Sequence, residues 1–561
     1  MCGIAGILMR ERTETPSPAG LRRMSRVLVH RGPDAEGFWE RGPAGLTHRR
    51  LSIIDLASGH QPMSSRDDTV HLVFNGEIYN FPELRNDLEQ AGYGFRTHSD
   101  TEVLLALYLQ YGLDAFPKLN GMFACAFWDE RSDRLVMARD RLGKKPLYYH
   151  INQRRVLFGS EMKALLAYGD LHPEVNLAAI HEYLTHSYIV GEDAILSGVK
   201  RLPPAHVLVV EHGRVICRPY WTFQFKPVTA PSPEEEVLER VEHLLRQAVK
   251  RRMMAEVPLG AFLSGGLDSS LVVALMTQLS DRPVRTFTIG FEESGYSEIE
   301  DARIVAKHLG TEHQELIVKP AGLDILPKVV WHLDEPFGDS SAIPTYYVCE
   351  AARRYVTLAI SGDGGDEVFA GYTRYLRLGD HLRMGHVPEW VRQGVVGPLV
   401  SALPFTAPGW NYLHAMSRHT SGGLPLNLGI YPFIQQQLYS KEFAGAVIGT
   451  DPMARSKRLQ GEAAGLDPVS RYQYVDTLEY LPADILTKVD RMSMANSLEV
   501  RSPLLDYTLV EYAATLPVSL KIRDGLGKYL LRKLLPKWLP PSLLSKPKQG
   551  FALPKDRWFR Q

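Results

Sequence analysis

The 561-residue chain has few cysteines, no net charge and no long apolar run. Its four cysteines, at positions 2, 125, 217 and 349, are far apart and form no CxxC pair, which argues against a disulfide framework or a zinc site. Lys plus Arg and Asp plus Glu both number 64, so the composition disfavours a nucleic-acid or anionic-membrane surface as the main function. No apolar stretch reaches about 18 residues and no signal segment opens the chain, so we expect a cytoplasmic protein without membrane contact.

The chain is longer than a typical single domain, and the pattern of apolar residues changes along it. Residues 2–190 hold short alternating apolar runs punctuated by Gly, Asn and Asp, which predicts mixed sheet with few helices. Residues 191–232 are rich in proline and are interpreted as a connector. Residues 233–561 form the second domain. Strands and helices alternate between 257 and 369, which predicts a parallel sheet with helices on both faces, and the remainder is mainly helical.

A glycine-rich loop, Ser264-Gly265-Gly266-Leu267-Asp268-Ser269-Ser270, separates an expected strand from an expected helix. Glycines let the backbone approach a ligand, and serine hydroxyls with N–H groups at a helix N-terminus favour anions. The loop matches neither GxxxxGK[ST] nor GxGxxG, and without a lysine it suits pyrophosphate better than a transferring γ-phosphate. A simple glycine-rich turn is the alternative.

A second string, residues 360–367 (ISGDGGDE), also ends an expected strand. Its clustered carboxylates repel one another, whereas Mg²⁺ shared with phosphate oxygens would use them. A solvated acidic turn is the alternative at this position.

The small residue Cys2 allows the initiator Met1 to be removed. One residue would then carry a thiol nucleophile and an α-amine that serves as its base. Taken alone, such a residue is more often an ordinary small residue. If the chain keeps Met1, we expect Cys2 not to show its working geometry.

The N-terminal Met-Cys-Gly-Ile together with the SGGxDSS loop, or PP-loop, indicates one family. Over essentially its whole length, the chain resembles the glutamine-hydrolysing asparagine synthetases. The resemblance implies a two-domain protein of class α/β and α+β. Its first domain would be a class II glutamine amidotransferase with the αββα sandwich of N-terminal nucleophile hydrolases. Its second would be an adenine-nucleotide alpha hydrolase-like, Rossmann-like parallel-sheet domain with a helical C-terminal part.

The resemblance also assigns a glutamine site within the strings at residues 30–34, 48–55, 74–80 and 99–102. Cys2 is the implied nucleophile, and a tetrahedral intermediate needs two donors aimed at its oxyanion. The implied donors are the Asn75 side chain and the Gly76 N–H. The implied glutamine-binding residues, with Arg50 on the α-carboxylate and two acids on the α-ammonium, are Arg50, Leu51, Ile53, Asn75, Gly76, Glu77 and Asp100.

In the second domain, the resemblance implies ATP contacts from Leu263, Ser264, Gly265, Gly266, Asp268, Ser269, Ser270, Ile289, Ser361 and Gly362. It further implies that Asp268 and Asp366 bind Mg²⁺ and that Lys548 neutralises phosphate charge. Asp363 stands where several members carry Glu, so its carboxylate is one methylene shorter in reach. The strings at 488–494 and 499–503 are assigned to the synthetase cleft without individual roles.

The resemblance thus predicts an ATP-dependent carbon–nitrogen ligase with glutamine, aspartate and ATP as its small-molecule partners, and a possible homodimer. Ammonia would travel unprotonated between the sites through a dry interdomain passage. Two alternatives stay open. The acceptor could be another carboxylate, such as a cell-envelope precursor. A non-catalytic sensor on the same scaffold would carry degraded motifs, and the main strings are intact.

Overall fold

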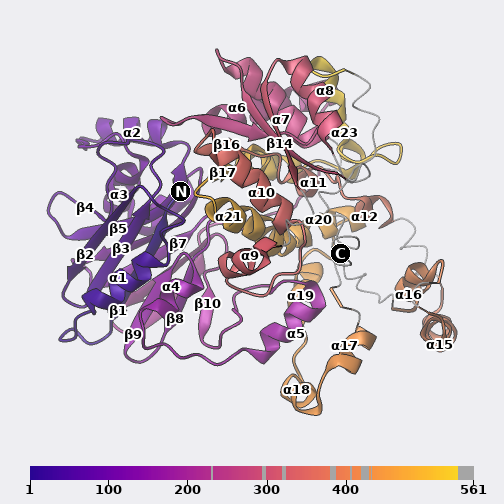
Figure 1. Ribbon diagram of the computed structural model, residues 1–561, viewed down its shortest axis with the longest axis horizontal. Helices are drawn as coiled ribbons and strands as arrows, with labels where there is room; N and C mark the ends of the chain where they lie inside the picture. Colours follow the sequence, from indigo (N-terminus) through magenta and orange to yellow (C-terminus); the bar gives the residue numbers. More distant parts are fainter. Residues whose placement is uncertain are drawn as a thin grey trace.

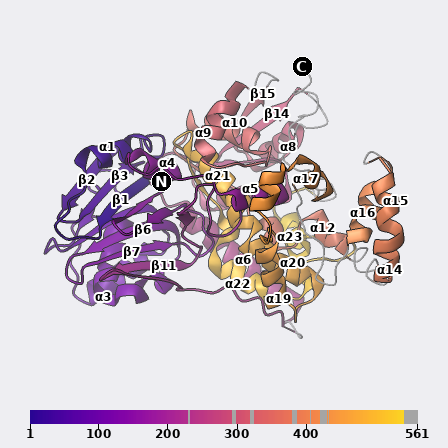
Figure 2. The same cartoon turned by 90° about the horizontal axis from the view of Figure 1, so that it is seen from below.

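The computed structural model describes residues 1–540, except 229–231, 293–297, 319–323, 379–386, 405–406, 419–428 and 431. Figures 1 and 2 show an N-terminal part built mainly of sheet beside a larger part of parallel sheet and helices. The N-terminus lies at the boundary between the two parts (Figure 1).

Two six-stranded antiparallel sheets form the N-terminal domain. The first has the order β10-β8-β9-β1-β3-β2, with bounds Val199–Arg201, Tyr148–Ile151, Arg155–Gly159, Gly3–Met9, Ala44–Arg50 and Ala35–Arg41. The second has the order β12-β11-β7-β6-β5-β4, with bounds Arg214–Pro219, His206–Glu211, Arg134–Arg139, Gly121–Asp129, Val70–Ile78 and Met63–Ser64.

Strand β1 shows how the sandwich is layered. Ile4 and Leu8 pack between the sheets, against residues such as Val73 of the second sheet. Ala5 and Ile7 point to the other face and pack against helices α1 (Pro18–Arg26) and α4 (Met162–Ala167). This alternation is the period of two that a strand imposes on its side chains. Helices α2 (Phe81–Gln90), α3 (Asp100–Tyr111) and the 3₁₀ segment Gly112–Lys118 pack on the far side of the second sheet. The αββα sandwich is therefore confirmed.

Residues 191–232, predicted to be the connector, hold three strands instead of one open stretch. β10 extends the first sheet, and β11 and β12 extend the second. The sheets therefore continue to Pro219, and we propose that the connector begins after it. Short strands whose partners lie far earlier in the chain, as Val199 opposite His150 and Val207 opposite Ala138, leave little local signal, because the pairing decides them.

The second domain is centred on a five-stranded parallel sheet of order β15-β14-β13-β16-β17. Its bounds are Glu312–Val318, Arg285–Phe291, Leu259–Phe262, Leu358–Ile360 and Glu499–Arg501. The helices that flank or follow these strands are α6 (Glu234–Arg252), α7 (Leu267–Leu279), α8 (Ile299–Leu309), α9 (Leu326–Leu333) and α10 (Ala342–Arg353). Helix α5 (Leu177–His186) comes earlier in the chain and contacts the C-terminal part, where the His186 ring lies 2.9 Å from the carbonyl oxygen of Pro452. The predicted parallel sheet is confirmed, and β17 joins it from far along the chain.

The C-terminal part is helical, as predicted. Its helices include α11 (Gly365–Val368), α12 (Thr373–Leu376), α14 (Glu389–Val391), α15 (Gly397–Ala402), α16 (Trp410–Arg418), α17 (Pro432–Leu438), α18 (Lys441–Ala446), α19 (Ala454–Glu462), α20 (Pro468–Leu478), α21 (Leu486–Met494), α22 (Tyr507–Ala514) and α23 (Tyr529–Leu534). In both ribbon views α15 and α16 lie at the end of the molecule away from the sandwich, whereas α21 lies against it (Figures 1 and 2).

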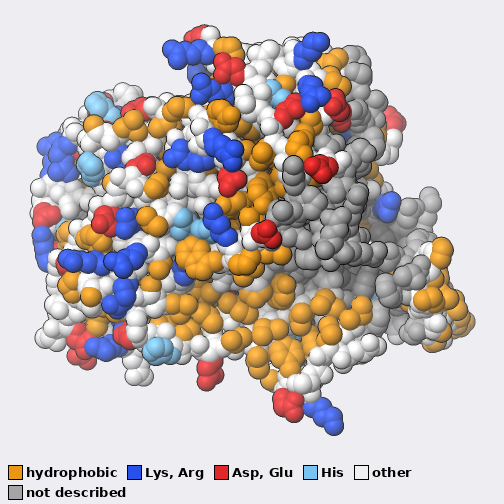
Figure 3. All heavy atoms as spheres, viewed as in Figure 1, with side chains coloured by type: hydrophobic (Ala, Val, Ile, Leu, Met, Phe, Trp, Pro, Cys, Tyr) orange, Lys and Arg blue, Asp and Glu red, His pale blue; other side chains and the backbone are white. Residues whose placement is uncertain are grey.

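The exposed surface carries both signs of charge. On the face drawn in Figure 3, Lys and Arg side chains are interspersed with Asp and Glu among the coloured, described residues. Within the described part of the chain, no helix has the length and apolar character needed to cross a bilayer.

Candidate functional site

Cys2 lies buried immediately before β1, at the boundary between the domains. Its peptide N–H donates to Oδ1 of Asn75 at 2.9 Å. Met1 precedes it, also buried, and the Met1 ammonium donates to Oε2 of Glu499 at 2.5 Å. The nitrogen of Cys2 is thus a peptide nitrogen in this chain and cannot act as a base. Burial raises the pKa of the Cys2 thiol, while the nearby Met1 ammonium lowers it.

Asn75 combines an anchored oxygen with an unpartnered donor. It lies on β5, fully buried, and its Nδ2 has no hydrogen-bond partner among the described residues. A buried amide donor without a partner costs free energy, so it suits an oxygen that arrives with a ligand. The neighbouring Gly76 allows no side chain, because a Cβ there would lie 2.1 Å from the carbonyl oxygen of Met122. The structure therefore places a free donor beside Cys2, as an oxyanion requires.

Arg50 ends β3 and is held by backbone carbonyls instead of carboxylates. Its guanidinium donates to the carbonyl oxygens of Asp55 at 2.5 Å and of Ile54 and Leu56 at 3.3 Å. Carbonyl oxygens fix the side chain without neutralising its charge. The buried guanidinium can therefore still pair with a ligand carboxylate.

Glu77 and Asp100 lie buried close to one another, at the end of β5 and the first position of α3. Oδ2 of Asp100 accepts the N–H of Ile78 at 2.9 Å, and Oε1 of Glu77 lies 3.4 Å from the guanidinium of Arg501. Burial raises the pKa of Glu77 well above its usual value, helped by the charge of Asp100. Burial raises the pKa of Asp100 to about 6. A bound ammonium would relieve both carboxyls.

The PP-loop follows β13 and leads into α7, as predicted. Gly265 has φ +74°, and a Cβ there would lie 2.5 Å from the Cβ of Asp301. The hydroxyls of Ser264 and Ser269 lie 3.0 Å apart, which closes the loop on itself. Oγ of Ser270 is buried and has no partner in the described part of the chain. The loop is thus a tight backbone cradle at a helix N-terminus.

The loop after β16 packs directly on the PP-loop. A Cβ on Gly362 would lie 2.7 Å from the backbone nitrogen of Ser269, so the close approach requires glycine. Oγ of Ser361 is 3.0 Å from Oγ of Ser502, which follows β17. Leu263 and Ile289 are buried at the ends of the two neighbouring strands. Three loops therefore meet at the carboxyl edge of the sheet, where ligands bind in folds of this type.

Asp268 and Asp366 approach the same cation, Lys528. The Lys528 ammonium pairs with Asp268 and lies 2.7 Å from Oδ1 of Asp366. Burial lowers the pKa of Lys528, and the two carboxylates outweigh it and raise that pKa overall. Lys528 is nearly buried and has φ +59°, an uncommon conformation for lysine. Lys528 is not among the site residues predicted from the sequence. Its only signal is a lysine after Gly525-Leu526-Gly527, and such a loop lysine is usually solvated.

The two aspartates fit Mg²⁺ in donor type. Mg²⁺ is commonly held by one or two carboxylates together with substrate phosphates. The described residues contain no cluster of three or more His, Cys, Asp or Glu side chains that would form an all-protein metal cage. A site of this kind would be completed by the nucleotide.

Asp363 is partly buried at the start of the same acidic loop. Burial raises its pKa, while Ser361 and the charge of Lys488 lower it. Nζ of Lys488 donates to Asp339 at 2.6 Å and to Ser341 at 2.7 Å. Lys548, the other predicted cation of this site, lies outside the described residues.

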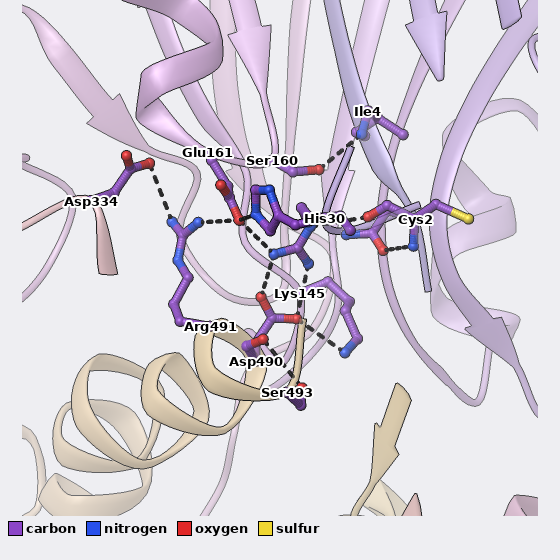
Figure 4. Close-up of polar contacts among 12 residues, drawn as sticks. Cys2, Ile4, His30, Lys145, Ser160, Glu161, Asp334, Asp490, Arg491 and Ser493 are labelled. Atoms are coloured by element: carbon purple, nitrogen blue, oxygen red, sulfur yellow. Dashed lines mark hydrogen bonds and ion pairs between the residues drawn. The ribbon is translucent and has the colours of Figure 1, made fainter. Parts of the chain in front are cut away.

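A buried ion-pair network joins the two domains beside Cys2 (Figure 4). Arg31 is fully buried and pairs with Glu161 at 2.9 Å and with Asp490 of α21 at 2.9 Å. Arg491, the next residue of α21, pairs with Glu161 at 2.9 Å. Neighbouring positions of one synthetase helix thus contact the amidotransferase side. From the sequence, residues 488–494 are predicted only to belong to the synthetase cleft, because a single residue's charge does not reveal a partner several hundred positions away.

Comparison with known proteins identifies both halves of the chain. The model of a glutamine amidotransferase domain matches residues 1–221, and the asparagine synthase model matches residues 240–561. The asparagine synthetase (glutamine-hydrolysing) 1 of Bacillus subtilis is 35% identical over 100% of this chain and 88% of its own length. A putative asparagine synthetase (glutamine-hydrolysing) of Mycobacterium tuberculosis is 35% identical over the same shares. A Gibberella zeae protein named amidase chry2 is 30% identical over 95% of this chain and 84% of its own length. With both halves matched and its full length aligned, the chain belongs to the family of glutamine-hydrolysing asparagine synthetases, ATP-dependent ligases that pair an amidotransferase domain with a synthetase domain.

Proposed function

We propose that this chain moves the amide nitrogen of glutamine to aspartate, with cleavage of ATP to AMP and pyrophosphate. The observation that carries the proposal is the unpartnered Nδ2 of Asn75 beside Cys2, in the same chain as the closed PP-loop. The first feature suits acyl transfer from a carboxamide. The second suits a pyrophosphate group.

In the amidotransferase domain, the thiolate of Cys2 attacks the carboxamide carbon of glutamine. Once Met1 is removed, the α-amine of Cys2 accepts the thiol proton and passes a proton to the leaving nitrogen. Nδ2 of Asn75 and the N–H of Gly76 donate to the oxyanion. Collapse gives a thioester and ammonia, and water then releases glutamate. The α-carboxylate of glutamine pairs with Arg50.

Two buried acids, Glu77 and Asp100, bind the α-ammonium end of glutamine. Glu77 and Asp100 face the α-ammonium of glutamine, which stabilises their charged forms. Leu51 and Ile53 supply apolar walls for its side chain. A free amino acid carries one charge of each sign, so one cation and two acids recognise it.

In the synthetase domain, the β-carboxylate of aspartate attacks the α-phosphorus of ATP and pyrophosphate leaves. Ser264, Ser269, Ser270 and the backbone N–H groups of the PP-loop bind the phosphates. Asp268 and Asp366 would hold Mg²⁺, which would supply positive charge against the phosphates. Lys528, already between these carboxylates, lies where it can also face the phosphates. Lys548 is proposed as a second such cation.

Ammonia then attacks the acyl carbon of the aspartyl-adenylate, and AMP leaves. We assign Asp363 to position this intermediate or to accept the ammonia proton. Ammonia must arrive unprotonated, since ammonium has no lone pair. The apolar cluster that spans the domains supports a dry route, and its buried members are Met1, Leu51, Ile53, Tyr79, Met122 and Met494.

The proposal is tested with amide-labelled glutamine, aspartate and Mg-ATP. Label is expected in asparagine, with AMP and pyrophosphate formed in equal amounts. Formation of ADP instead of AMP would contradict the PP-loop interpretation. Label that stays in ammonia, with no asparagine, would contradict aspartate as the acceptor.

A second candidate keeps the chemistry and changes the acceptor carboxylate, for example to a cell-envelope precursor. Asp363 supports this second candidate, because its carboxylate is one methylene shorter than the Glu of several family members and so reaches less far toward the acyl centre. A relative named amidase shows that the architecture also occurs under another name. A pyrophosphate-release assay across a panel of carboxylates separates the two. Release with another carboxylate and none with aspartate would replace the first proposal.

A cytoplasmic location and a homodimer stay predictions. Light scattering of the purified chain tests the second.

A further inference from the structure

Asp490 lies on a synthetase helix, and its carboxylate is bound from the amidotransferase side. Oδ2 accepts from Nη1 of Arg31 at 2.9 Å and Oδ1 from Nη2 of Arg31 at 3.1 Å, a two-pronged contact. Nζ of Lys145 lies 3.3 Å from Oδ1. Asp490, Arg31 and Lys145 are all buried. The two carboxylate oxygens of Asp490 bind both terminal nitrogens of the Arg31 guanidinium, so they fix the orientation of the guanidinium plane as well as its position.

The oriented guanidinium of Arg31 reaches the nucleophile residue itself. Nε of Arg31 donates to the carbonyl oxygen of Cys2 at 3.1 Å. On the other side of Cys2, its N–H donates to Asn75. The backbone of Cys2 is therefore held from both sides, by Asn75 of its own domain and, through Arg31, by Asp490 of the other domain.

The same helix also contacts the synthetase site. Lys488 precedes Asp490 by two positions on α21, which places the two side chains on opposite sides of the helix. Lys488 pairs with Asp339 at 2.6 Å, and its charge lowers the pKa of Asp363. Helix α21 thus presents Lys488 to Asp339 and Asp363 of the proposed synthetase site, and Asp490 to the Arg31 that contacts Cys2.

We infer that Asp490 is a positioning residue for the glutaminase centre: through the Arg31 guanidinium it fixes the backbone carbonyl of Cys2 and so the attack geometry of the thiol. This role rests on the proposed function of Cys2. Asp490 touches no substrate, and it acts from the domain that does not hydrolyse glutamine. A displacement of about 1 Å at a reacting group can lower a rate about 100-fold, so a loosened Cys2 backbone would slow glutamine attack.

The test is Asp490→Asn in the full chain, with three assays: glutamate release, glutamine-dependent asparagine synthesis and ammonia-dependent asparagine synthesis. We expect kcat for glutamate release to fall at least about 10-fold, because the neutral amide cannot hold both prongs of Arg31. The KM for glutamine should stay within about 3-fold, since Arg31 contacts the nucleophile and not the substrate. Ammonia-dependent synthesis should also stay within about 3-fold.

Two matched variants separate positioning from general loss of the interface. Asp506→Asn removes another buried synthetase carboxylate that contacts the N-terminal domain, since Asp506 pairs with Arg252 at 2.8 Å and accepts from Asn120 at 3.1 Å. Lys145→Gln removes the second cation on Asp490 and leaves the Arg31 contact in place. Both should keep kcat for glutamate release within about 3-fold. If Asp490→Asn does not fold, Asp490→Glu keeps the charge and shifts the contact by one methylene, and the same selective loss in kcat is expected.

The role is overturned if glutamate release by the folded Asp490 variant is unchanged, if ammonia-dependent synthesis falls with it, or if Asp506→Asn causes the same loss. A wild-type chain without any glutamate release would instead overturn the proposed function, and this role with it.

Discussion

The side-chain oxygen of Asn75 accepts the backbone N–H of Cys2 at 2.9 Å, while the Nδ2 of the same amide is buried without a partner among the described residues. One end of the amide thus orients the nucleophile and the other end is left for a ligand oxygen. A buried donor is seldom left unpaired, so an unpartnered Nδ2 on the same amide that contacts Cys2 points to acyl transfer.

Asn75→Ala should lower kcat for glutamate release about 100- to 1,000-fold, because one of two oxyanion donors is lost. Ammonia-dependent asparagine synthesis should continue, since Asn75 is remote from the PP-loop. Asn152→Ala, in an exposed turn, is the control and should change neither rate. Equal losses in both reactions would indicate a folding defect instead.

Cys2→Ala should abolish use of glutamine and leave synthesis from added ammonia intact. The exposed Cys217 provides a matched cysteine control, and Cys217→Ala should leave both reactions unchanged. Glutamate release that survives in Cys2→Ala would show that another group attacks glutamine. Mass spectrometry of the active chain should also find Met1 absent, because its retention converts the Cys2 amine into a peptide nitrogen.

Gly76→Ala should destabilise the fold as well as the glutaminase. The new methyl group would lie 2.1 Å from the carbonyl oxygen of Met122, so β5 and β6 must move apart. Overpacking of this kind costs about 1–3 kcal/mol of unfolding free energy. Thermal unfolding measures the shift, and Gly465→Ala, with open space around its Cβ position and no positive φ, tests whether glycine loss alone matters less. A Gly76→Ala chain as stable as wild type would contradict the packing argument.

Glutamine binding should weaken as the pH falls through about 6. Burial raises the pKa of Asp100 from 3.8 to about 6, so its carboxyl becomes neutral below that pH and loses its attraction for the α-ammonium. The same shift has a stability consequence. Between pH 3.8 and 6 the folded chain binds this proton more tightly than the unfolded chain, so its contribution to the free energy of unfolding falls as pH rises.

The measurement is the KM for glutamine between pH 5 and about 8 in wild type and Asp100→Asn. Wild type should show a rising KM below about pH 6, and the variant should have a high KM with less dependence on pH. A wild-type KM that is flat over this range would contradict the assignment of Asp100 to the ammonium.

Mg-ATP should raise the melting temperature of the wild-type chain, because a ligand that binds only the folded state stabilises it. Asp268→Asn should reduce that rise, since one of the two carboxylates suited to Mg²⁺ is lost. Lys528→Met should lower pyrophosphate release while glutamate release continues. A full Mg-ATP shift in Asp268→Asn would contradict this metal assignment.

The local patterns predicted much of the fold. The helix at α3 and the strand–helix alternation after residue 257 follow from periodicity and turn residues, which act over a few positions. The connector was harder to predict, because β10 and β11 pair with strands much earlier in the chain and β12 in turn pairs with β11. Strand propensity is weak where the partner decides. β17 was missed as a strand for the same reason.

By itself the sequence determined the kinds of group available: a thiol after Met1, a glycine-rich loop without lysine, an acidic loop and the family resemblance that orders them. Only the tertiary structure decided that Asn75 keeps a free donor beside Cys2, that Lys528 lies between Asp268 and Asp366, and that Asp490 reaches across the domains to Arg31. These contacts join residues dozens to hundreds of positions apart. Their partners are set by packing and by the need to pair buried charge, which no local pattern encodes.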